Sequence, residues 1–549
     1  MELSIDVETY CACPIKYGAQ RYVDDTTFEI LLFAYSFDNE PVEVIDMTKN
    51  PLPERVVDAL YNKEITKTAF NAAFEMLCLK KYFPDADYTN WECTSVLALY
   101  CSLPASLDNV SKALKLGEAK DSRGKRLIQF FSVPRKPTKT NPKTRNMPED
   151  APEKWAEFIE YNRQDVVVEK AIRKRLLSLK PPDIEHEYWL LDQDINWRGV
   201  KVDMDLVDAA LQCNDEIVEK ATVSSARLTG LDNPNSTLQL RDWLSNRLGY
   251  EVETMRKGDV SNLLLQDIPS DVRTVLKNRQ VLGNSSIKKY LAVKNAVCSD
   301  GRIHGMLQFY GAMRSGRWAG RVVQLQNLPR NYLEDLDTAR DVLKSRDVEL
   351  LDLLYGNPGD VIKQLIRTAL VAEEGHRFIV ADFSAIEARV IAWLAHEQWR
   401  QDVFAQGGDI YCASASSMFH VPVEKHGVNG HLRQKGKVAE LALGYGGGVG
   451  AMKSMDSKGE IPESELPGII EAWRRASPRI TRFWKDANTA AKKVVKTGEP
   501  VRIRQGNIRF FKSKGFMFIE LPSGRRLAYA RPRIGLNRFG SESIEYDGM

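Results

Sequence analysis

The sequence predicts a multidomain protein that combines α/β and α+β architecture, and three observations support this prediction. The chain has 549 residues, more than one hydrophobic core usually supports, so roughly two to four domains are expected. Strand and helix patterns alternate over residues 1–180, and a mainly helical region follows over residues 185–300. The last fifty residues return to strand patterns.

The first 180 residues carry the α/β part of this prediction. LSIDVETY (3–10) and FEILLFAYSF (28–37) are short and apolar, as expected of strands. PERVVDALYN (53–62) and NAAFEMLCLKKYF (71–83) place apolar residues three and four positions apart, which predicts helices. Alternation of such elements is typical of a sheet covered by helices.

Further elements are expected beyond residue 300. IHGMLQFYGA (303–312) alternates like a strand, and HRFIVAD (376–382) is an apolar run that predicts another strand. Residues 431–497 have a helical pattern with two breaks. Two strand-like segments close the chain, at 501–511 and 516–530.

Composition leaves the class of partner open. The chain has 77 Lys and Arg against 74 Asp and Glu, a net charge of +3 that neither requires nor excludes nucleic acid. The eight cysteines contain no CxxC pair, which favours reduced thiols in a cytoplasmic protein over disulfides or zinc. The sequence contains no apolar run of about 18 residues and begins with a strand-like segment instead of a signal peptide. We therefore expect a cytoplasmic protein with no membrane partner.

The segment RQKGKVAELALGYGGGVG (433–450) is rich in glycine, but its glycines follow a helix. Phosphate-binding loops have the opposite order, so these glycines indicate the end of a helix. Four side chains recur at four-residue spacing: Arg433, Lys437, Leu441 and Tyr445. One helix face would present them together, with cations for a triphosphate and apolar groups for base and sugar. The alternative is a surface helix whose charges are solvated.

The segment VADFSAIEARVIAWLA (380–395) places a carboxylate where a strand ends and a helix begins near Ser384. Asp382 is well positioned there to hold a divalent cation in a cleft. Glu387 completes a Ser-x-x-Glu capping box, which predicts a helix start. A cap and a functional role for Glu387 are compatible.

Taken together, these motifs resemble DNA polymerase family A, the class of bacterial DNA polymerase I, in a phage-type form. The matching segments share the order of the family's motifs. DFSAIEARV is similar to motif A, and RQKGKVAELALGYG is similar to motif B. SGRWAGRVVQLQNLP (315–329) resembles the segment that lines the primer end. The flanking segments IRTALVAEEG (366–375) and GGDIY (407–411) also fit the family.

The resemblance implies a right-hand polymerase with palm, fingers and thumb. Asp382 would bind the catalytic metals, and Glu387 would lie at the 2′ position of the incoming sugar and disfavour ribonucleotides. Arg433 and Lys437 would bind the triphosphate of a dNTP. The chemistry requires two metals about 3.5–4 Å apart, and two Mg²⁺ are expected, with Mn²⁺ as the alternative.

The resemblance also implies contacts to the primer–template. Tyr445 would support the nascent base pair. Leu441 stands where the family usually has an aromatic residue, so contact with the sugar would differ at that position. Three residues would contact primer and template near the terminus: Arg317, Gln326 and Asn327.

A second acidic set lies near the start of the chain. Asp6 and Glu8 alternate on a predicted strand and so point to one side of it, although a single Asp-x-Glu pair can also arise by chance. FNAAFE adds Glu75, and YNRQDVVVE adds Tyr161 and Asp165 at i and i+4 of a helix. Together they resemble a DEDD-type 3′–5′ exonuclease on a ribonuclease-H-like sheet.

In that resemblance Asp6, Glu8 and Asp165 would hold two metals, and Tyr161 would orient the attacking water. Glu75 would complete the metal site, in a place where the family usually has Asp. The alternative for Glu75 is a solvated helix residue without a role.

The family's third palm motif, a His-Asp pair between apolar strand segments, has no match in the sequence. Asp547 has neither apolar flanks nor a preceding His. The sequence therefore predicts a polymerase whose last part is missing, as a fragment, a split-gene product or a natural truncation. A separately encoded C-terminal segment is one expected partner, besides primer–template DNA and dNTPs.

Three functions follow from these predictions: a proofreading DNA polymerase, an autonomous 3′–5′ exonuclease with an impaired polymerase half that grips primer–template, and a non-catalytic DNA-binding module. If the protein is phage-encoded, its compartment is the host cytoplasm. The expected domains are an exonuclease-like domain (1–185), a linker with thumb-like helices (186–300), palm with motif A (301–400), fingers with motif B (401–500) and a partial return to palm (501–549).

Overall fold

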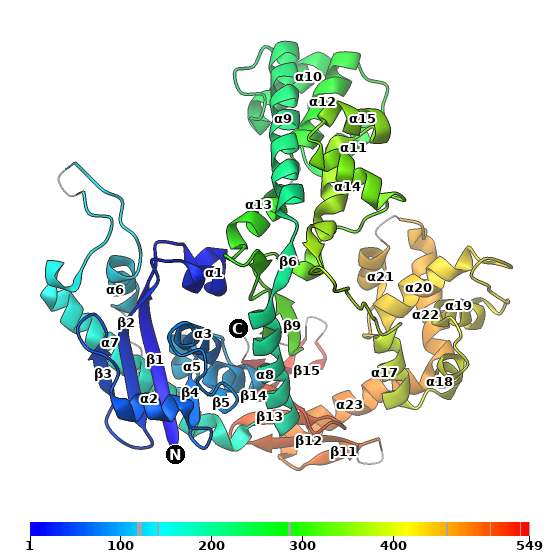
Figure 1. Cartoon of the computed structure of the whole chain (residues 1–549). Coiled ribbons are helices and arrows are strands. Elements are labelled where there is room, and N and C mark those ends of the chain that lie inside the picture. Colours follow the sequence, from blue (N-terminus) through cyan, green and yellow to red (C-terminus); the bar gives the residue numbers. More distant parts are fainter. Residues whose placement is uncertain are drawn as a thin grey trace. The chain divides into compact units, whose positions relative to one another are not determined.

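A computed structural model shows two compact units, each described by itself below (Figure 1). The first unit comprises Met1–Leu99 and Pro104–Phe378, and the second comprises Tyr100–Leu103 and Ile379–Met549. The structure describes residues 1–117, 123–139, 142–283, 287–313, 315–456, 459–504, 507–537 and 540–547.

A five-stranded sheet forms the N-terminal part of the first unit, in the order β3-β2-β1-β4-β5. β1 pairs antiparallel with β2 and parallel with β4, so one sheet combines both kinds of pairing. The strands predicted at 3–10 and 28–37 are confirmed, and the nearly continuous burial of β2 fits a central strand covered on both faces. The strands are β1 (Glu2–Tyr10), β2 (Glu29–Phe37), β3 (Glu43–Asp46), β4 (Thr66–Ala69) and β5 (Trp91–Cys93).

Helices pack against this sheet, and the two helices predicted at 53–62 and 71–83 are confirmed. α7 packs on β1, β2 and β3, and α3 packs on β1, β4 and β5. The elements are η1 (Ile15–Tyr17), α1 (Ala19–Asp24), α2 (Glu54–Tyr61), α3 (Ala72–Tyr82), α4 (Thr94–Tyr100), α5 (Leu107–Leu114), α6 (Gly124–Phe131), η2 (Pro148–Asp150), α7 (Pro152–Leu176) and η3 (Leu177–Leu179).

The helical region predicted over residues 185–300 is also confirmed. Its longest helix, α9, begins where the side chain of Asp203 accepts a hydrogen bond from Leu206 N and ends at the left-handed Gly230. Figure 1 shows α9 beside α10 and α12. The helices are α8 (Asp183–Arg198), α9 (Met204–Thr229), α10 (Thr237–Leu248), α11 (Lys257–Leu264), α12 (Ser270–Leu282) and α13 (Ile287–Ala296).

Short strands and helices complete the first unit. One sheet has the order β10-β6-β7, and β8 and β9 form a separate hairpin that confirms the strand predicted within 303–312. The elements are β6 (Val200–Val202), β7 (Arg302–Ile303), β8 (Leu307–Ala312), β9 (Arg317–Gly320), η4 (Leu325–Asn327), α14 (Leu336–Lys344), α15 (Val348–Tyr355), α16 (Pro358–Leu365), η5 (Ile366–Ala369) and β10 (Leu370–Val371).

The second unit begins with a group of helices around a core that includes the fully buried Trp473. The helical prediction for 431–497 is confirmed. The helices are α17 (Ile386–Ala395), α18 (Gln398–Ala405), α19 (Ile410–Phe419), α20 (Leu432–Leu443), α21 (Val449–Met455), η6 (Glu463–Glu465), α22 (Leu466–Ala476) and α23 (Pro478–Thr497).

A five-stranded antiparallel sheet follows, in the order β11-β12-β13-β14-β15, with α23 packed against it. Both strand segments predicted at 501–511 and 516–530 are confirmed. The strands are β11 (Val501–Ile503), β12 (Ile508–Ser513), β13 (Phe516–Glu520), β14 (Arg526–Leu536) and β15 (Glu542–Asp547). No described helix has the length and apolar character needed to cross a membrane.

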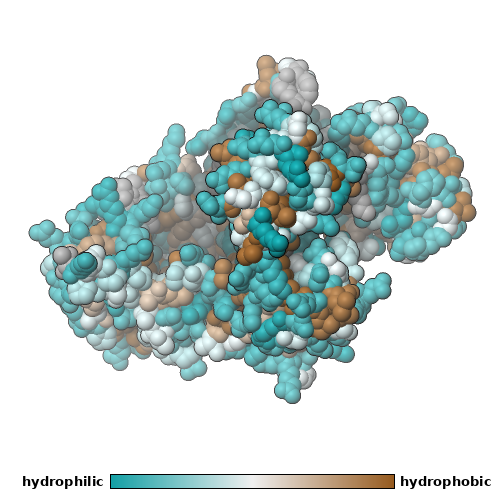
Figure 2. All heavy atoms as spheres, turned by 90° about the horizontal axis from the view of Figure 1, so that it is seen from above, coloured by the Kyte–Doolittle hydropathy of each residue, from teal (hydrophilic) through white to brown (hydrophobic). Residues whose placement is uncertain are grey.

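The strand predicted at 376–382 is wrong, because these residues adopt no regular secondary structure. Ile379 and Val380 are 87% and 89% exposed. A strand needs a neighbour to pair with its backbone N–H and C=O groups, and none of the described strands pairs with this segment. The segment Phe378–Phe383, which is apolar except for Asp382, is therefore exposed to solvent. We call it the open segment. The face shown in Figure 2 is largely hydrophilic, with apolar areas between the hydrophilic ones.

Candidate active sites

Three carboxylates of the first unit form a compact acidic cluster. Asp6 and Glu8 project from β1, and Asp165 projects from α7, with one oxygen of each lying within 4.8 Å of the others. The alternation along β1 brings the first two together, as predicted, and the packing of α7 on β1 supplies the third. Close carboxylates repel one another, so such a cluster is suited to a bound cation.

The cluster is held by neighbouring polar groups. Asn162 is fully buried and donates a hydrogen bond from Nδ2 to Asp6 Oδ2 at 2.6 Å. Tyr161 is hydrogen-bonded to Asp165. Burial raises the pKa of the Tyr161 phenol, and the charges of Glu8 and Asp165 raise it further, so the phenol stays protonated and can donate.

Glu75 lies beside this cluster, on α3. Its side chain is buried, so the solvated alternative for Glu75 is wrong. Burial raises the pKa of the Glu75 carboxyl well above its ordinary value, and the charge of Asp6 adds to the effect. Glu75 is not one of the three residues whose oxygens lie within 4.8 Å of one another. Its Oε2 atom is buried without a hydrogen-bond partner among the described residues.

A further buried carboxyl, Glu169, lies one helical turn after Asp165. Thr94 donates a hydrogen bond to it, but burial dominates and raises the pKa of Glu169 to about 7. Its charge also acts to raise the pKa of Glu75. The acidic character of this region therefore extends beyond the residues predicted from sequence.

Tyr161 is held in place by close packing. A Cβ atom added to Gly124 on α6 would lie 2.0 Å from the Tyr161 ring, so only glycine fits there. The ring is also stacked on Phe158, with centroids 6.1 Å apart. The position of the phenol thus depends on α6, which is remote from the acidic residues in sequence.

In the second unit α20 presents the predicted nucleotide-binding face. Arg433 and Lys437 are half-buried and Leu441 is exposed, whereas the opposite side of the helix is buried. Tyr445 follows the end of the helix and is 68% exposed, so it does not continue the helical row. The prediction of one face made of four side chains therefore holds for the first three only.

Arg433 is paired with Asp409, which lies just before α19. Arg433 Nε and Nη2 both lie 2.8 Å from Asp409 Oδ2, and the guanidinium lies over the Tyr411 ring. The other oxygen of Asp409 accepts hydrogen bonds from the first turn of α19. Burial acts to raise the pKa of Asp409, but the donors, led by Arg433, outweigh it and hold the pKa below its ordinary value.

Asp382 lies exposed in the open segment, and Glu387 lies exposed in the first turn of α17. The predicted capping box is wrong: Ala385, in a left-handed conformation, precedes the helix, and no side chain caps it.

The predicted primer contacts lie in the first unit, on and after β9. Arg317, Gln326 and Asn327 are all exposed. The β8–β9 hairpin is attached to α8, because Trp318 on β9 donates a hydrogen bond from Nε1 to Asp192 on α8 at 2.8 Å. Burial raises the pKa of Asp192 to about 6.

Comparison with known proteins identifies the family. Residues 207–515 match the model of DNA polymerase family A. The DNA polymerase of Bacillus phage SP02 is 49% identical over 556 aligned positions, which cover 100% of this chain and 85% of that protein. The chain belongs to DNA polymerase family A. The predicted family resemblance is thereby confirmed, and DNA polymerase is the function that these relatives support.

More distant relatives agree over shorter stretches. The thermostable DNA polymerase I of Thermus thermophilus is 36% identical over 149 residues, 27% of this chain and 17% of that protein. The solved POL domain of Pol1 from M. smegmatis, in complex with DNA primer-template and dNTP, has a TM-score of 0.59 at 16% identity, covering 95% of this chain and 77% of that one. This likeness confirms the predicted fold class.

Several residues that support these sites were not assigned a role from the sequence. Asn162 falls between Tyr161 and Asp165 in the quoted motif, and Asp409 falls within GGDIY, so both were visible but carried no assigned role. Glu169 ends the quoted motif YNRQDVVVE and continues the four-residue spacing of Tyr161 and Asp165, so it too was visible without an assigned role. Gly124 had no sequence signal, because its position matters only through a tertiary contact.

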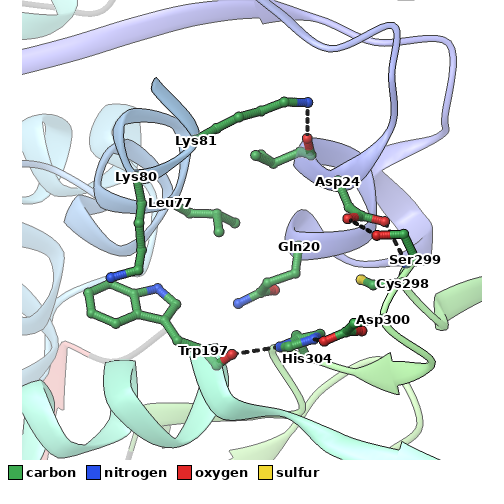
Figure 3. A pocket seen from close by; sticks show the side chains of 11 residues that line it. Gln20, Asp24, Leu77, Lys80, Lys81, Trp197, Cys298, Ser299, Asp300 and His304 are labelled. Carbon is green, nitrogen blue, oxygen red and sulfur yellow. Dashed lines mark hydrogen bonds and ion pairs between the residues drawn. The ribbon is translucent and has the colours of Figure 1, made fainter. Parts of the chain in front are cut away.

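The first unit also contains a separate cavity of about 360 Å³, shown in Figure 3. Its charged groups already have partners. Lys81 donates to the Val23 and Asp25 carbonyls, and Lys80 lies over the Trp197 ring. Both carboxylates of the wall are engaged as well: Asp24 with Ser299 and Asp300 with His304. The lining therefore favours neither an anion nor a cation.

Proposed function

We propose that this family A chain carries two separate centres for phosphoryl transfer with divalent cations. One centre copies a DNA template, with Asp382 as a metal ligand. The other removes nucleotides from a DNA 3′ end, at the acidic cluster of the first unit. The observation that carries the second assignment is the convergence of Asp6, Glu8 and Asp165 within 4.8 Å.

The donor set of the acidic cluster fits Mg²⁺, with Mn²⁺ as the alternative. Carboxylate oxygens are the ligands that hard cations prefer, and three lie together here. Glu75 has a buried oxygen without a hydrogen-bond partner in the described part of the chain, which suits it as a further ligand. Two bound cations would supply charge stabilisation to the attacking and leaving oxygens of the phosphodiester.

The chain's own residues orient this reaction. Asn162 holds the Asp6 carboxylate through the 2.6 Å hydrogen bond and so fixes one ligand oxygen. Tyr161 stays protonated because of burial and neighbouring charge, so its hydroxyl can hydrogen-bond to the attacking water. The extra methylene of Glu75, compared with the aspartate usual in the family, places its oxygens differently, and we expect them to approach the site when a cation offsets the repulsion from Asp6.

On α20 the partly exposed Arg433 and Lys437 would bind the triphosphate of a dNTP. Arg433 is held by Asp409 through two contacts of 2.8 Å to one oxygen. A triphosphate carries more negative charge than one carboxylate and can take over the guanidinium bidentately. Leu441 and Tyr445 would border sugar and base, and Glu387 would exclude a ribose 2′ hydroxyl.

Asp382 requires a second carboxylate to complete a two-metal site. We propose that a further polypeptide segment with apolar–His-Asp–apolar sequence pairs with the open segment and brings that carboxylate. The exposure of Ile379 and Val380 supports this partner, because adding a strand would bury both side chains and pair their backbone. The nucleotide sequence beyond codon 549 is the simplest check for such a segment, in frame or in a neighbouring gene.

The remaining partners follow from these centres. Arg317, Gln326 and Asn327 would contact primer and template, and their exposure leaves them accessible. A protein that copies a DNA template from dNTPs works where both are present, so we propose the cytoplasm of the host cell as its compartment.

A single assay tests the proposal. A hairpin labelled at its 5′ end is incubated with the chain and Mg²⁺, with and without dNTPs, and the lengths of the products are measured. We expect shortening from the 3′ end without dNTPs, and loss of that shortening with EDTA. Shortening that persists in EDTA, or that is absent at every Mg²⁺ and Mn²⁺ concentration, would contradict the exonuclease assignment.

A further inference from the structure

The helix α20 is anchored in the second unit by a buried carboxylate. Glu440 Oε1 accepts hydrogen bonds from Ser414 Oγ at 2.5 Å and Trp473 Nε1 at 2.7 Å. Glu440 Oε2 accepts one from Arg400 Nη1 at 2.6 Å. Arg400 in turn donates from Nη2 to Ser477 Oγ at 2.8 Å. We call these five residues the α20 anchor.

The α20 anchor joins elements that are far apart in sequence. Arg400 comes from α18, Ser414 from α19 and Trp473 from α22, and all three meet one carboxylate of α20. The side chains of Arg400 and Glu440 are 0% and 3% exposed. A buried ion pair contributes little net stability compared with apolar packing, so its distinctive contribution is direction: each hydrogen bond fixes an angle.

The anchor lies close to the proposed nucleotide-binding face. Glu440 comes three residues after Lys437, and a helix turns about 100° per residue, so the two side chains point to adjacent sides. One turn earlier, a Cβ at Gly436 would lie 2.2 Å from the Tyr411 carbonyl oxygen, so α19 and α20 touch there. α20 is thus fixed at two successive turns.

We infer that Glu440 is a positioning residue for nucleotide binding: the α20 anchor sets the rotation of α20 and thereby aims Arg433 and Lys437 at the triphosphate. The inference rests on the proposed function of α20. It goes beyond it by assigning dNTP affinity to a side chain that would not touch the nucleotide. Loss of the anchor would let the helix rotate and misplace both cations.

The test measures dNTP binding without chemistry. Every chain compared, including the one called unaltered, carries Asp6→Ala, so that the proposed exonuclease centre does not remove the dideoxy 3′ end. A labelled hairpin with a dideoxy 3′ end is mixed with the full chain, Mg²⁺ and increasing complementary dNTP, and the half-saturating dNTP concentration is read from retention of the hairpin. Glu440→Gln is compared with the unaltered chain at a temperature where circular dichroism shows both fully folded. We expect that concentration to rise about ten- to a hundredfold, while affinity for the hairpin alone is unchanged.

Two further variants sharpen the test. Glu465→Gln is the matched control, because Glu465 also forms an ion pair with α20, through Lys435, but at the surface. The half-saturating dNTP concentration of this variant should equal that of the unaltered chain. Ser414→Ala removes one hydrogen bond to Glu440 and little volume, and should raise the concentration severalfold. It carries the test alone if Glu440→Gln does not fold.

The outcomes distinguish failure of the inference about Glu440 from failure of the proposed function of α20. If fully folded Glu440→Gln and Ser414→Ala bind dNTP as the unaltered chain does, while Lys437→Ala binds it weakly, the anchor is merely structural and the inference is overturned. If Lys437→Ala also binds dNTP normally, the proposed function of α20 fails, and the inference fails with it.

Discussion

The acidic cluster of the first unit and the region around Asp382 in the second unit differ in how fully the fold surrounds them. Asp6, Glu8 and Asp165 are brought together by a strand and a helix. Asp382 lies in the open segment, which has no regular secondary structure and highly exposed apolar neighbours. Both regions carry carboxylates that the sequence predicts to bind metals, but among the described residues only those of the first region lie together.

The difference shows that carboxylates predicted to bind a metal come together only where neighbouring elements hold them. Asn162 and Tyr161 restrain Asp6 and Asp165, and those restraints come from α7 and not from the motif strand. For Asp382 the described residues provide no strand to pair with. Variants can therefore test the activity proposed for the first region separately from the further segment proposed for the second.

The largest effect is expected for Asp165→Asn. Removing one of three clustered carboxylates should lower exonuclease activity by more than about 100-fold, since even outer partners of metal ligands cost roughly 10–100-fold. The rate of shortening of a labelled single strand with Mg²⁺ measures this loss. Asp382→Asn should leave that rate unchanged. Equal losses in both variants would mean that the two regions do not act separately.

A smaller loss is expected for Gly124→Ala. The new Cβ would overlap the Tyr161 ring at 2.0 Å and push the phenol away from Asp165, lowering the exonuclease rate by about 10–100-fold. Gly117→Ala is the matched control, because its Cβ would meet nothing within 4 Å. An unchanged rate in Gly124→Ala would show that Tyr161 has no part in the reaction.

Glu169→Gln should change how stability depends on pH. Burial raises the folded-state pKa of Glu169 to about 7, from an unfolded value near 4.5, so folding keeps the proton. A group with a raised folded pKa destabilises the fold as pH rises through that window, by on the order of 3 kcal/mol in all. The variant should therefore gain stability over the unaltered chain between about pH 4.5 and 7. Denaturant unfolding at several pH values measures this, and parallel pH profiles would contradict it.

The smallest effect on this chain is expected for Ile379→Lys. The side chain is 87% exposed, so the free energy of unfolding should change by less than about 0.5 kcal/mol. Extension in the presence of an added palm segment should nevertheless be lost, because a charge would face the docked strand. Unfolding curves and primer extension test the two halves, and a strong loss of stability would mean that Ile379 is already covered.

Local patterns predicted most elements of the fold. The alternation of β1 placed Asp6 and Glu8 on one side of a strand, and the i, i+4 spacing of α7 placed Tyr161 and Asp165 on one side of a helix. Only the resemblance to a DEDD-type exonuclease implied that the two sets meet, because the packing of α7 on β1 has no local signature. The prediction of a strand at 376–382 was wrong because strand formation depends on a neighbouring strand, and no local pattern shows whether that neighbour is present.

The supporting residues could not be predicted from the sequence. Gly124 matters through a contact with Tyr161, and Glu440 through donors on three other helices, so neither has a local signature. The sequence also left open whether Glu75 is a metal ligand or a solvated residue, because α3 has no clear apolar face that would indicate its burial. Composition and spacing identified the chemical groups, whereas tertiary packing determines their restraint and protonation.

The most direct measurement follows extension and degradation of one labelled hairpin in the unaltered chain, Asp6→Ala and Asp382→Ala. Two independent centres predict that Asp6→Ala loses degradation and keeps whatever extension the unaltered chain supports, while Asp382→Ala does the reverse. Degradation that survives Asp6→Ala, or extension that survives Asp382→Ala, would contradict the assignment of the corresponding centre.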